Sequence, residues 1–148
     1  MEADALAALH RLSIIAHCSS AYSAGQINAW TAVLAPEAYA SLIDNADVLV
    51  DTDEADGTIL GLGVSPNIEV IHAVYVTPGM TRRGVGRALM NAMEALLRDA
   101  NVPEARLNAT LNAARFYRSI GYRDGAPSLN FLPSGIELPC VRMRKLLD

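Results

Sequence analysis

Two glycines and three arginines stand together at the start of a predicted helix, in the segment Arg82-Arg-Gly-Val-Gly-Arg87. Glycines at a helix start let the backbone approach a bulky anion closely, and the free N–H groups of the first helical turn point toward that anion. The arginines add positive charge at the same place. The segment therefore predicts a site for a phosphate or pyrophosphate group, contacted by at least one of Arg82 and Arg83.

The sequence departs from two common phosphate-binding loops. Gly79 and Gly84 have the glycine spacing of a P-loop, but Val85 and Gly86 stand where that loop requires Lys and Ser or Thr. Gly84 and Gly86 also begin a dinucleotide-binding pattern, which Leu89 interrupts at the third glycine position. Both departures argue against a nucleoside triphosphatase and against an NAD-dependent enzyme.

The composition is that of one globular domain spanning residues 1–148, with 51% hydrophobic and 19% charged residues. A net charge of −4 argues against a general nucleic-acid binder. No apolar run approaches the ~18 residues of a membrane span, and acidic residues follow Met1 where a signal peptide would have basic ones. We therefore expect a cytoplasmic protein that binds neither nucleic acid nor membrane.

The two cysteines and two of the three histidines are not expected to do chemistry. Cys18 and Cys140 lie far apart and lack the spacing of zinc ligands, so we expect no metal site. Two reduced, buried thiols are the expected state, with a single disulfide as the alternative. Neither cysteine has the setting of a catalytic nucleophile. His10 and His17 fall on the first predicted helix and are not expected to be catalytic.

Periodicity and capping residues predict three helices followed by three strands. The first helix covers about residues 3–17, and the second runs through Trp30 from a capping box at Ser23–Gln26. Pro36 suits the first position of the third helix. The strands are expected at residues 48–50, 58–64 and 68–76.

The second half of the sequence alternates helices and strands. Asn101 and Pro103 stop a strongly amphipathic helix, and a later helix is capped by Asn112 and closed by Gly121. The order of the elements predicts a mixed sheet with helices on both faces. The helices are expected at 87–100, with an apolar stripe of Leu89, Met93, Leu96 and Leu97, and at 113–120, and the strands at 106–111, 128–132 and 138–144.

Two signatures resemble the GNAT superfamily of N-acetyltransferases. The first, Tyr75-Val-Thr-Pro followed by Arg-Arg-Gly-Val-Gly-Arg-Ala-Leu89, resembles the coenzyme A-binding segment of that superfamily. The second, Asn112–Tyr122, resembles its pattern Asn-x-x-x-x-Phe/Leu-Tyr-x-x-x-Gly-Phe/Tyr. The two come in the family's order and at its separation, and the close match covers about residues 69–122. Looser agreement over Tyr22–Trp30 resembles the substrate-side segment of one bacterial branch.

The resemblance implies an α/β fold with a mixed, mostly antiparallel central sheet that is splayed at the cofactor strand. Such proteins usually begin with a strand, whereas this sequence starts almost inside the first helix at Met1. We therefore expect the first N-terminal strand to be missing, leaving an exposed edge that would encourage association into a homodimer. Thr81 replaces the family's usual Gln or Arg, which predicts a weaker contact on the phosphate side.

The resemblance also implies an activity, the transfer of the acetyl group from acetyl-CoA to a primary amine by direct attack in a ternary complex. The acceptor would be a small-molecule or peptide amine of open identity, and an acyl group other than acetyl stays open too. The negative net charge slightly favours a cationic acceptor. The alternative is a non-catalytic acyl-CoA-binding or sensing module on the same fold.

In this family the pyrophosphate of coenzyme A lies on the amides that correspond to residues 82–87. Its pantetheine arm would run beside the strand at Val74–Val76, and the N–H of Val76 would reach the thioester oxygen. Asn112 would cap its helix, contact the cofactor, or do both. The implied cofactor-binding residues are Val74, Val76, Arg82, Arg83, Gly84, Val85, Gly86, Arg87 and Asn112.

Tyr117 is the implied acid, because the family often has a tyrosine hydroxyl near the thioester sulfur at this position. The plainer interpretation is a tyrosine packed on its helix. His72 shares the strand parity of Val76 and is the candidate general base, with Glu69 as the second choice, although a lone strand histidine is more often structural. Tyr22 and Trp30 either line the substrate site or pack in the core.

Overall fold

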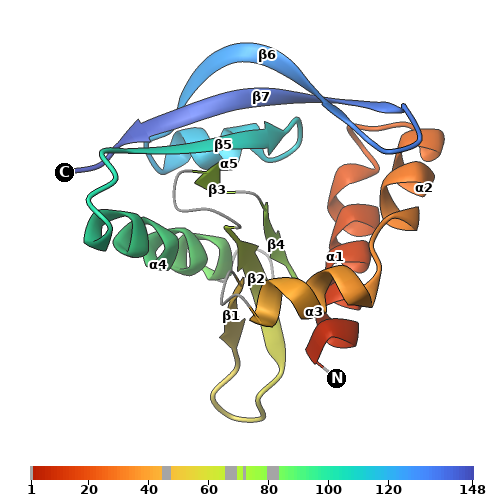
Figure 1. Ribbon diagram of the computed structural model, residues 1–148, viewed down its shortest axis with the longest axis horizontal. Coiled ribbons are helices and arrows are strands. Elements are labelled where there is room, and N and C mark those ends of the chain that lie inside the picture. The colour runs from red at the N-terminus through yellow and green to blue at the C-terminus, as the bar shows by residue number, and fades with distance from the viewer. Residues whose placement is uncertain (1, 45–47, 66–69, 72, 80–83) are drawn as a thin grey trace.

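The computed structural model describes residues 2–44, 48–65, 70–71, 73–79 and 84–148. It opens with three helices at the predicted places, α1 (Glu2–Cys18), α2 (Ala24–Ala32) and α3 (Pro36–Asp44) (Figure 1). The predicted capping box is present: Ser23 Oγ accepts a hydrogen bond from the N–H of Gln26 at 3.1 Å, and Gln26 Oε1 accepts one from the N–H of Ser23 at 2.8 Å. These two bonds fix the start of α2 after the α1–α2 turn.

The first of two sheets is antiparallel and has the order β1-β2-β4. Its strands are β1 (Val48–Thr52), β2 (Ile59–Val64) and β4 (Ala73–Val76). Among the described residues, β1 pairs only with β2, so it forms an outer edge of this sheet, and α1 is the first element.

The second sheet has the order β3-β5-β7-β6. β3 (Val70–Ile71) runs parallel to β5 (Glu104–Thr110), and β7 (Glu137–Leu146) pairs antiparallel with both β5 and β6 (Arg123–Phe131). The single strand expected at 68–76 is therefore wrong, because β3 hydrogen-bonds to β5 whereas β4 hydrogen-bonds to β2. The expected splay is confirmed, since no ladder joins β4 to β5 in the part of the chain that the structure describes.

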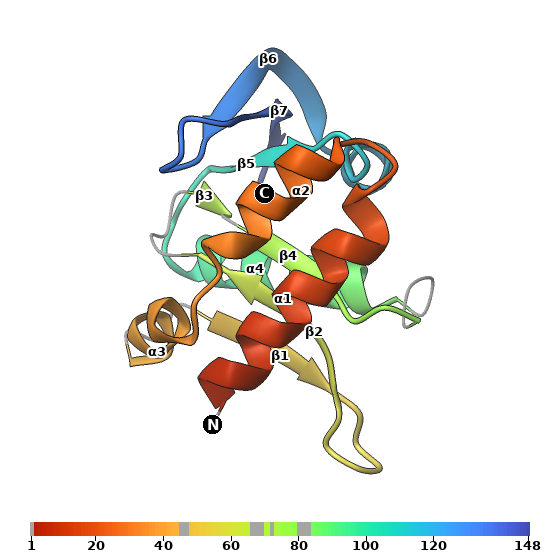
Figure 2. The same ribbon diagram turned by 90° about the vertical axis from the view of Figure 1, so that its right-hand side faces the viewer.

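Helices cover both faces of the first sheet, as the sequence predicts. α1 and α4 (Val85–Asp99) lie on opposite sides of β2 and β4 (Figure 2). α5 (Ala114–Ser119) packs against the second sheet through Ala114 and Tyr117, which join the core cluster around Leu107 and Met143. The arrangement is the mixed, mostly antiparallel α/β fold expected from the resemblance.

The buried face of α4 is wider than the expected stripe. Three of the four expected apolar residues are buried, but Leu96 is 55% exposed, so its expected burial is wrong. Met90 and Glu94 are buried in its place because α4 packs against both sheets, and the buried arc is centred near Met93 with Leu96 at its margin. The other two buried residues of the stripe are Leu89 and Leu97.

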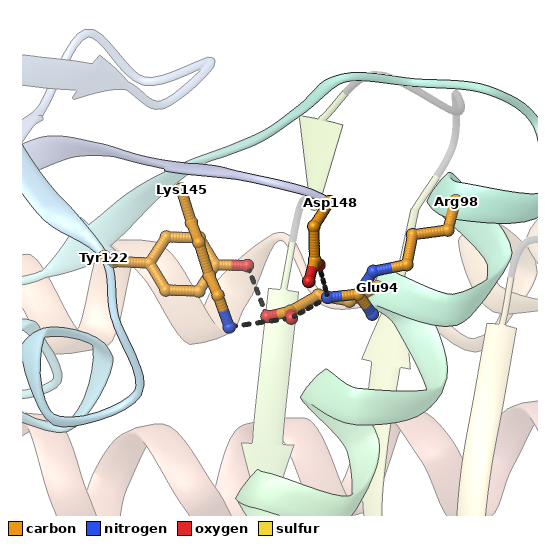
Figure 3. A network of polar contacts seen from close by, with 5 residues as sticks. All are labelled: Glu94, Arg98, Tyr122, Lys145 and Asp148. Carbon is orange, nitrogen blue, oxygen red and sulfur yellow. Dashed lines mark hydrogen bonds and ion pairs between the residues drawn. The ribbon is translucent and has the colours of Figure 1, made fainter.

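The carboxylate of Glu94 links α4 to the last strand (Figure 3). Its Oε1 accepts a hydrogen bond from Lys145 Nζ at 2.9 Å, and its Oε2 accepts one from the hydroxyl of Tyr122 at 2.9 Å. Arg98 Nη2 lies 3.7 Å from Glu94 Oε1 and 3.3 Å from a carboxylate oxygen of Asp148. Burial, together with the nearby Glu94, raises the pKa of Tyr122 above its ordinary value, so the phenol stays a donor.

The helix-ending residues predicted for α4 and α5 are confirmed, whereas the predicted N-cap of α5 is not. Asn101 (φ 60°) and Gly121 (φ 102°) take the left-handed conformation after their helices, and their N–H groups bond back to the last helical turn. The expected cap at Asn112 is wrong, because the residue at the N-cap is Ala113, which makes no side-chain capping bond.

Candidate active site

A cleft of about 620 Å³ lies between β4, the start of α4, α5 and the end of α1. It brings together most of the cofactor residues named from the sequence, together with Tyr117. Arg82, Arg83, His72 and Glu69 lie outside the described residues, and their roles stay predictions. The residues brought together are Val74, Val76, Gly84, Val85, Gly86, Arg87, Asn112 and Tyr117.

The edge of β4 that faces the splay is open to an extended ligand. The N–H of Thr77 donates to the carbonyl of Leu60 at 2.8 Å, which places this pair in the hydrogen-bonded phase of the β2–β4 ladder. Antiparallel strands alternate between bonded and non-bonded pairs. Val74 and Val76 fall in the other phase, so their N–H and C=O groups point away from β2, toward the gap before β5.

The N-terminus of α4 presents free backbone donors to the same cleft. Its N-cap, Gly84, has φ 79°, a left-handed conformation that costs glycine little, and it makes no side-chain capping bond. The first intrahelical bond there runs from the N–H of Ala88 to the carbonyl of Gly84, at 2.9 Å. The preceding N–H groups of the first turn therefore have no helical acceptor, and Arg87 adds positive charge beside them.

Gly86 allows this helix start to lie against α5. A β-carbon at position 86 would lie 3.2 Å from Cζ of Phe116, which is tighter than ordinary side-chain packing. Phe116 is half-buried and lines the cleft beside the ring of Tyr117, with their centroids 5.2 Å apart. The Gly-x-Gly spacing thus serves both the left-handed cap and the close helix contact.

Tyr117 is buried, yet its ring borders the cleft. Its hydroxyl makes no hydrogen bond with any of the residues that the structure describes. Burial raises the pKa of Tyr117 well above the ordinary value of 10.0, so the phenol is protonated at neutral pH. A protonated hydroxyl without an internal partner is a proton donor available to a ligand in the cleft.

Asn112 reaches the cleft from the turn before α5, where its side chain hydrogen-bonds the thiol of Cys18. Burial raises the pKa of the Cys18 thiol to about 11, and the bond from Asn112 opposes that rise only in part. Cys18 and Cys140 are both free and buried.

His17 is a cleft residue that the sequence interpretation set aside. It lines the cleft from the last turn of α1, and its Nε2 is buried without a hydrogen-bond partner among the described residues. Ser13, one turn earlier, lines the same cleft. Their spacing of one helical turn was the sequence signal that could have placed Ser13 and His17 on the same face of α1. His10 instead packs against Tyr39 and Tyr75.

Tyr22 and Trp30 pack in a buried cluster and are not among the described residues that line the cleft. The hydroxyl of Tyr22 donates to the carbonyl of Pro139 at 2.5 Å and accepts from the N–H of Leu111 at 3.1 Å. The ring centroids of Tyr22 and Trp30 are 5.7 Å apart. The geometry therefore favours the core interpretation of both aromatics over a substrate wall.

Within residues 2–44, 48–65, 70–71, 73–79 and 84–148, no His, Cys, Asp and Glu side chains gather in a group of three or more that could hold a metal ion. The helices of the same ranges are all too short or too polar to span a bilayer.

Comparison with known proteins identifies the class that this fold and cleft define. The family model of the acetyltransferase (GNAT) domain matches residues 18–147. The chain belongs to the GNAT acetyltransferase family. It is therefore an acyltransferase, and acetyl-CoA is its acyl donor. A comparison with curated protein sequences finds no match.

Solved structures agree with this assignment. A GCN5-related N-acetyltransferase from Rhodopseudomonas palustris is 26% identical with a TM-score of 0.90, over 99% of this chain and 90% of the other. PaiA N-acetyltransferase from Thermoplasma acidophilum, solved with coenzyme A, is 20% identical with a TM-score of 0.73, over 99% and 93%. Ribosomal-protein-alanine N-acetyltransferase from Brucella melitensis is 21% identical with a TM-score of 0.69, over 99% and 94%.

Proposed function

We propose that the protein transfers the acetyl group of acetyl-CoA directly to a primary amine, with both substrates bound at once. Acetyl-CoA supplies an activated thioester. The observation that carries the proposal is the meeting, in one cleft, of the open edge of β4 and the hydroxyl of Tyr117, which has no hydrogen-bond partner among the residues that the structure describes. A bound thioester needs a donor for its oxygen and a proton for its departing sulfur, and these two groups supply them.

The chain's own groups divide the work along the cleft. The free N–H groups at the start of α4 and the charge of Arg87 hold the pyrophosphate. Val74 and Val76 bind the pantetheine arm as an added strand, and the N–H of Val76 stabilises charge on the thioester oxygen, worth about 3 kcal/mol in such sites. Tyr117 donates a proton to the leaving sulfur. His72, and after it Glu69, are the proposed bases for the amine.

A direct attack suits the state of the thiol in the cleft. Cys18 is buried, and burial raises the pKa of its thiol to about 11, so little thiolate exists near neutral pH. An acetyl-cysteine intermediate is therefore disfavoured. The free, buried cysteines also fit a reducing, cytoplasmic setting.

The acceptor proposed here is a small-molecule or peptide amine. Neighbours in structure include PaiA N-acetyltransferase, a ribosomal-protein-alanine N-acetyltransferase and Naa20 bound to a bisubstrate analogue, so the fold serves several acceptors. Release of coenzyme A thiol from acetyl-CoA is the assay, run with a panel of small amines and short peptides. Amine-dependent thiol release that falls in Tyr117→Phe supports the proposal. Thiol release that is unchanged by that substitution would show that Tyr117 is not the general acid. Binding of acetyl-CoA with no transfer to any amine would favour a sensing module.

A further inference from the structure

Four arginines gather on the outer face of the second sheet. Arg106 on β5 pairs directly with Arg144 on β7, which in turn pairs directly with Arg123 on β6. Arg142 lies two residues before Arg144 and therefore shares its face. Four of the twelve Lys and Arg residues of an acidic chain thus stand side by side. Like charges in directly opposed cross-strand positions destabilise a sheet unless an anion offsets them.

The strand β6 shapes a hollow over these arginines. Its register with β7 shifts between Asp124 and Pro127, and β6 arches away from β7 there (Figure 1). The small residues Gly125 and Ala126 occupy the bulge. The resulting hollow of about 640 Å³ is lined by these two residues and by Arg106, Asn108, Arg142 and Arg144, among others.

Two of the guanidinium groups in this hollow lack an internal counter-ion. Arg106 Nε bonds Glu104 Oε1 at 3.0 Å. Arg142 and Arg144 have neither an ion pair nor a hydrogen bond from their side chains to any residue that the structure describes. Lys145, next along β7, differs because its side chain turns to the opposite face and binds Glu94 (Figure 3). The hollow therefore presents two free guanidinium groups.

Strand β5 relates the hollow to the gap between β4 and β5, where a small pocket borders the cleft. Asn108 stands directly opposite Arg142 in the β5–β7 register and lines the hollow. The same Asn108 lines a small pocket of about 30 Å³ in the gap, together with Tyr75 and Tyr117 of the cleft. Of the arginines that line the hollow, Arg142 is the one whose directly paired residue on β5 also borders that gap.

The geometry points to an acceptor that carries a carboxylate: an amino acid or short peptide whose anionic group lies on Arg142 and Arg144 while its amine enters the gap beside Asn108. This inference rests on the proposed acetyl transfer. A guanidinium group matches a carboxylate with two parallel hydrogen bonds. Glu104, the carboxylate that lines the hollow, pairs with Arg106, so the donors of Arg142 and Arg144 stay free among the described residues. The local positive charge outweighs, at this short range, the weak attraction for cations expected from the net charge of −4.

The test is calorimetric titration of the coenzyme A-saturated protein with ω-amino acids of increasing chain length, each beside its primary amide. The two members of a pair differ only in the charge that the hollow would recognise. We expect the best carboxylate to bind about 10- to 100-fold more tightly than its amide. In Arg142→Gln that preference should fall about tenfold, with binding of the amide unchanged. Arg11→Gln, which removes an exposed arginine from α1, should keep the preference.

Equal binding of acids and amides, or no binding of either, would overturn the inference. So would an unchanged preference in Arg142→Gln. Thiol release measured on the same pairs separates this inference from the proposed function. Selective binding of carboxylates without any release supports the hollow and contradicts acetyl transfer to them, whereas release with no preference for the acid supports the transfer and contradicts the hollow.

Discussion

Gly86 of α4 and Phe116 of α5 pack so closely that a β-carbon at position 86 would lie 3.2 Å from the ring's Cζ. The contact joins the start of α4, which is proposed to bind the pyrophosphate, to the helix that carries Tyr117. Gly86 and Phe116 both line the cleft, so their contact sets how closely these two walls approach each other.

Gly86→Ala should weaken acetyl-CoA binding about tenfold, because the ring of Phe116, which lines the cleft, must shift by a few tenths of an ångström. The substitution also raises helix propensity, so the free energy of unfolding should not fall. Gly25→Ala in α2 is the matched control, since its β-carbon would meet only Ser23 Oγ at 3.9 Å. Calorimetry and urea unfolding measure both effects, and equal acetyl-CoA affinity in wild type and Gly86→Ala would contradict this account of the cleft.

Tyr117→Phe should lower kcat about 100-fold while leaving the affinity for acetyl-CoA unchanged. The hydroxyl makes no internal hydrogen bond among the described residues, so its removal should cost little stability. Because burial raises the pKa of Tyr117, the wild-type acid loses its proton only as the pH rises above the ordinary value of 10.0. Activity should therefore show no loss from this group between neutral pH and that value. A fall in acetyl-CoA affinity with kcat unchanged would instead make Tyr117 a binding residue.

The thiol of Cys18 should resist alkylation in the folded protein. Burial raises its pKa to about 11, so thiolate forms only as the pH rises through that value. The contribution of this thiol to the free energy of unfolding is therefore present at lower pH and is lost as the pH rises through about 11. Iodoacetamide at mildly alkaline pH should label Cys18 only after denaturation, as followed by mass spectrometry. Cys18→Ala should retain amine-dependent release of coenzyme A thiol, and neither this variant nor the wild type should show an initial burst of thiol release. A burst in the wild type that Cys18→Ala abolishes would restore the covalent route.

Tyr22→Phe should lower the free energy of unfolding by about 2 kcal/mol. It removes the hydroxyl that donates to Pro139 and accepts from Leu111, and it leaves that backbone N–H unpaired. Urea denaturation measures the change. Since Leu111 precedes Asn112, the transfer rate should fall as well. A stable Tyr22→Phe variant with altered acceptor preference would return Tyr22 to the substrate site.

Glu94→Gln should destabilise the fold by about 1–3 kcal/mol, because Lys145 loses the carboxylate that it binds at 2.9 Å. Arg98→Gln is the control: its side chain is 37% exposed and lies 3.7 Å from the same carboxylate, so its loss should cost less than about 0.5 kcal/mol. Equal effects of the two substitutions on urea unfolding would show that burial of the pair does not govern its contribution.

That Gly84, Gly86 and Tyr117 belong to one site could be predicted from sequence, because they fall in short local segments; that the cleft they line holds the cofactor stays a prediction. Gly84, Gly86 and the helix they begin lie within one short segment, and Tyr117 belongs to a second. The division of β3 from β4 could not, since it depends on which distant strand each one pairs with. The expected cap at Asn112 was wrong because α5 begins one residue later, with Ala113 at its N-cap.

The arginine hollow shows the same limit from the other side. Arg106, Arg123, Arg142 and Arg144 are scattered in the sequence, and only the register of three strands places them on one face. Part of the placement of His17 could have been predicted, because its helical spacing from Ser13 puts the two side chains on one face of α1. That this face of α1 borders the cleft could not be predicted, because it depends on how α1 packs against β4, α4 and α5, which lie far along the sequence.

Changes in the backbone amide shifts of the isotope-labelled protein on addition of acetyl-CoA show whether this ligand occupies the cleft. We expect the largest changes at Val74 and Val76, at Gly84–Arg87 and around Tyr117, and none of these changes with ATP. Residues of the outer hollow, such as Arg144, should change little. Shifts that cluster away from β4 and the start of α4, or no shifts at all, would contradict the assignment of this cleft to acetyl-CoA.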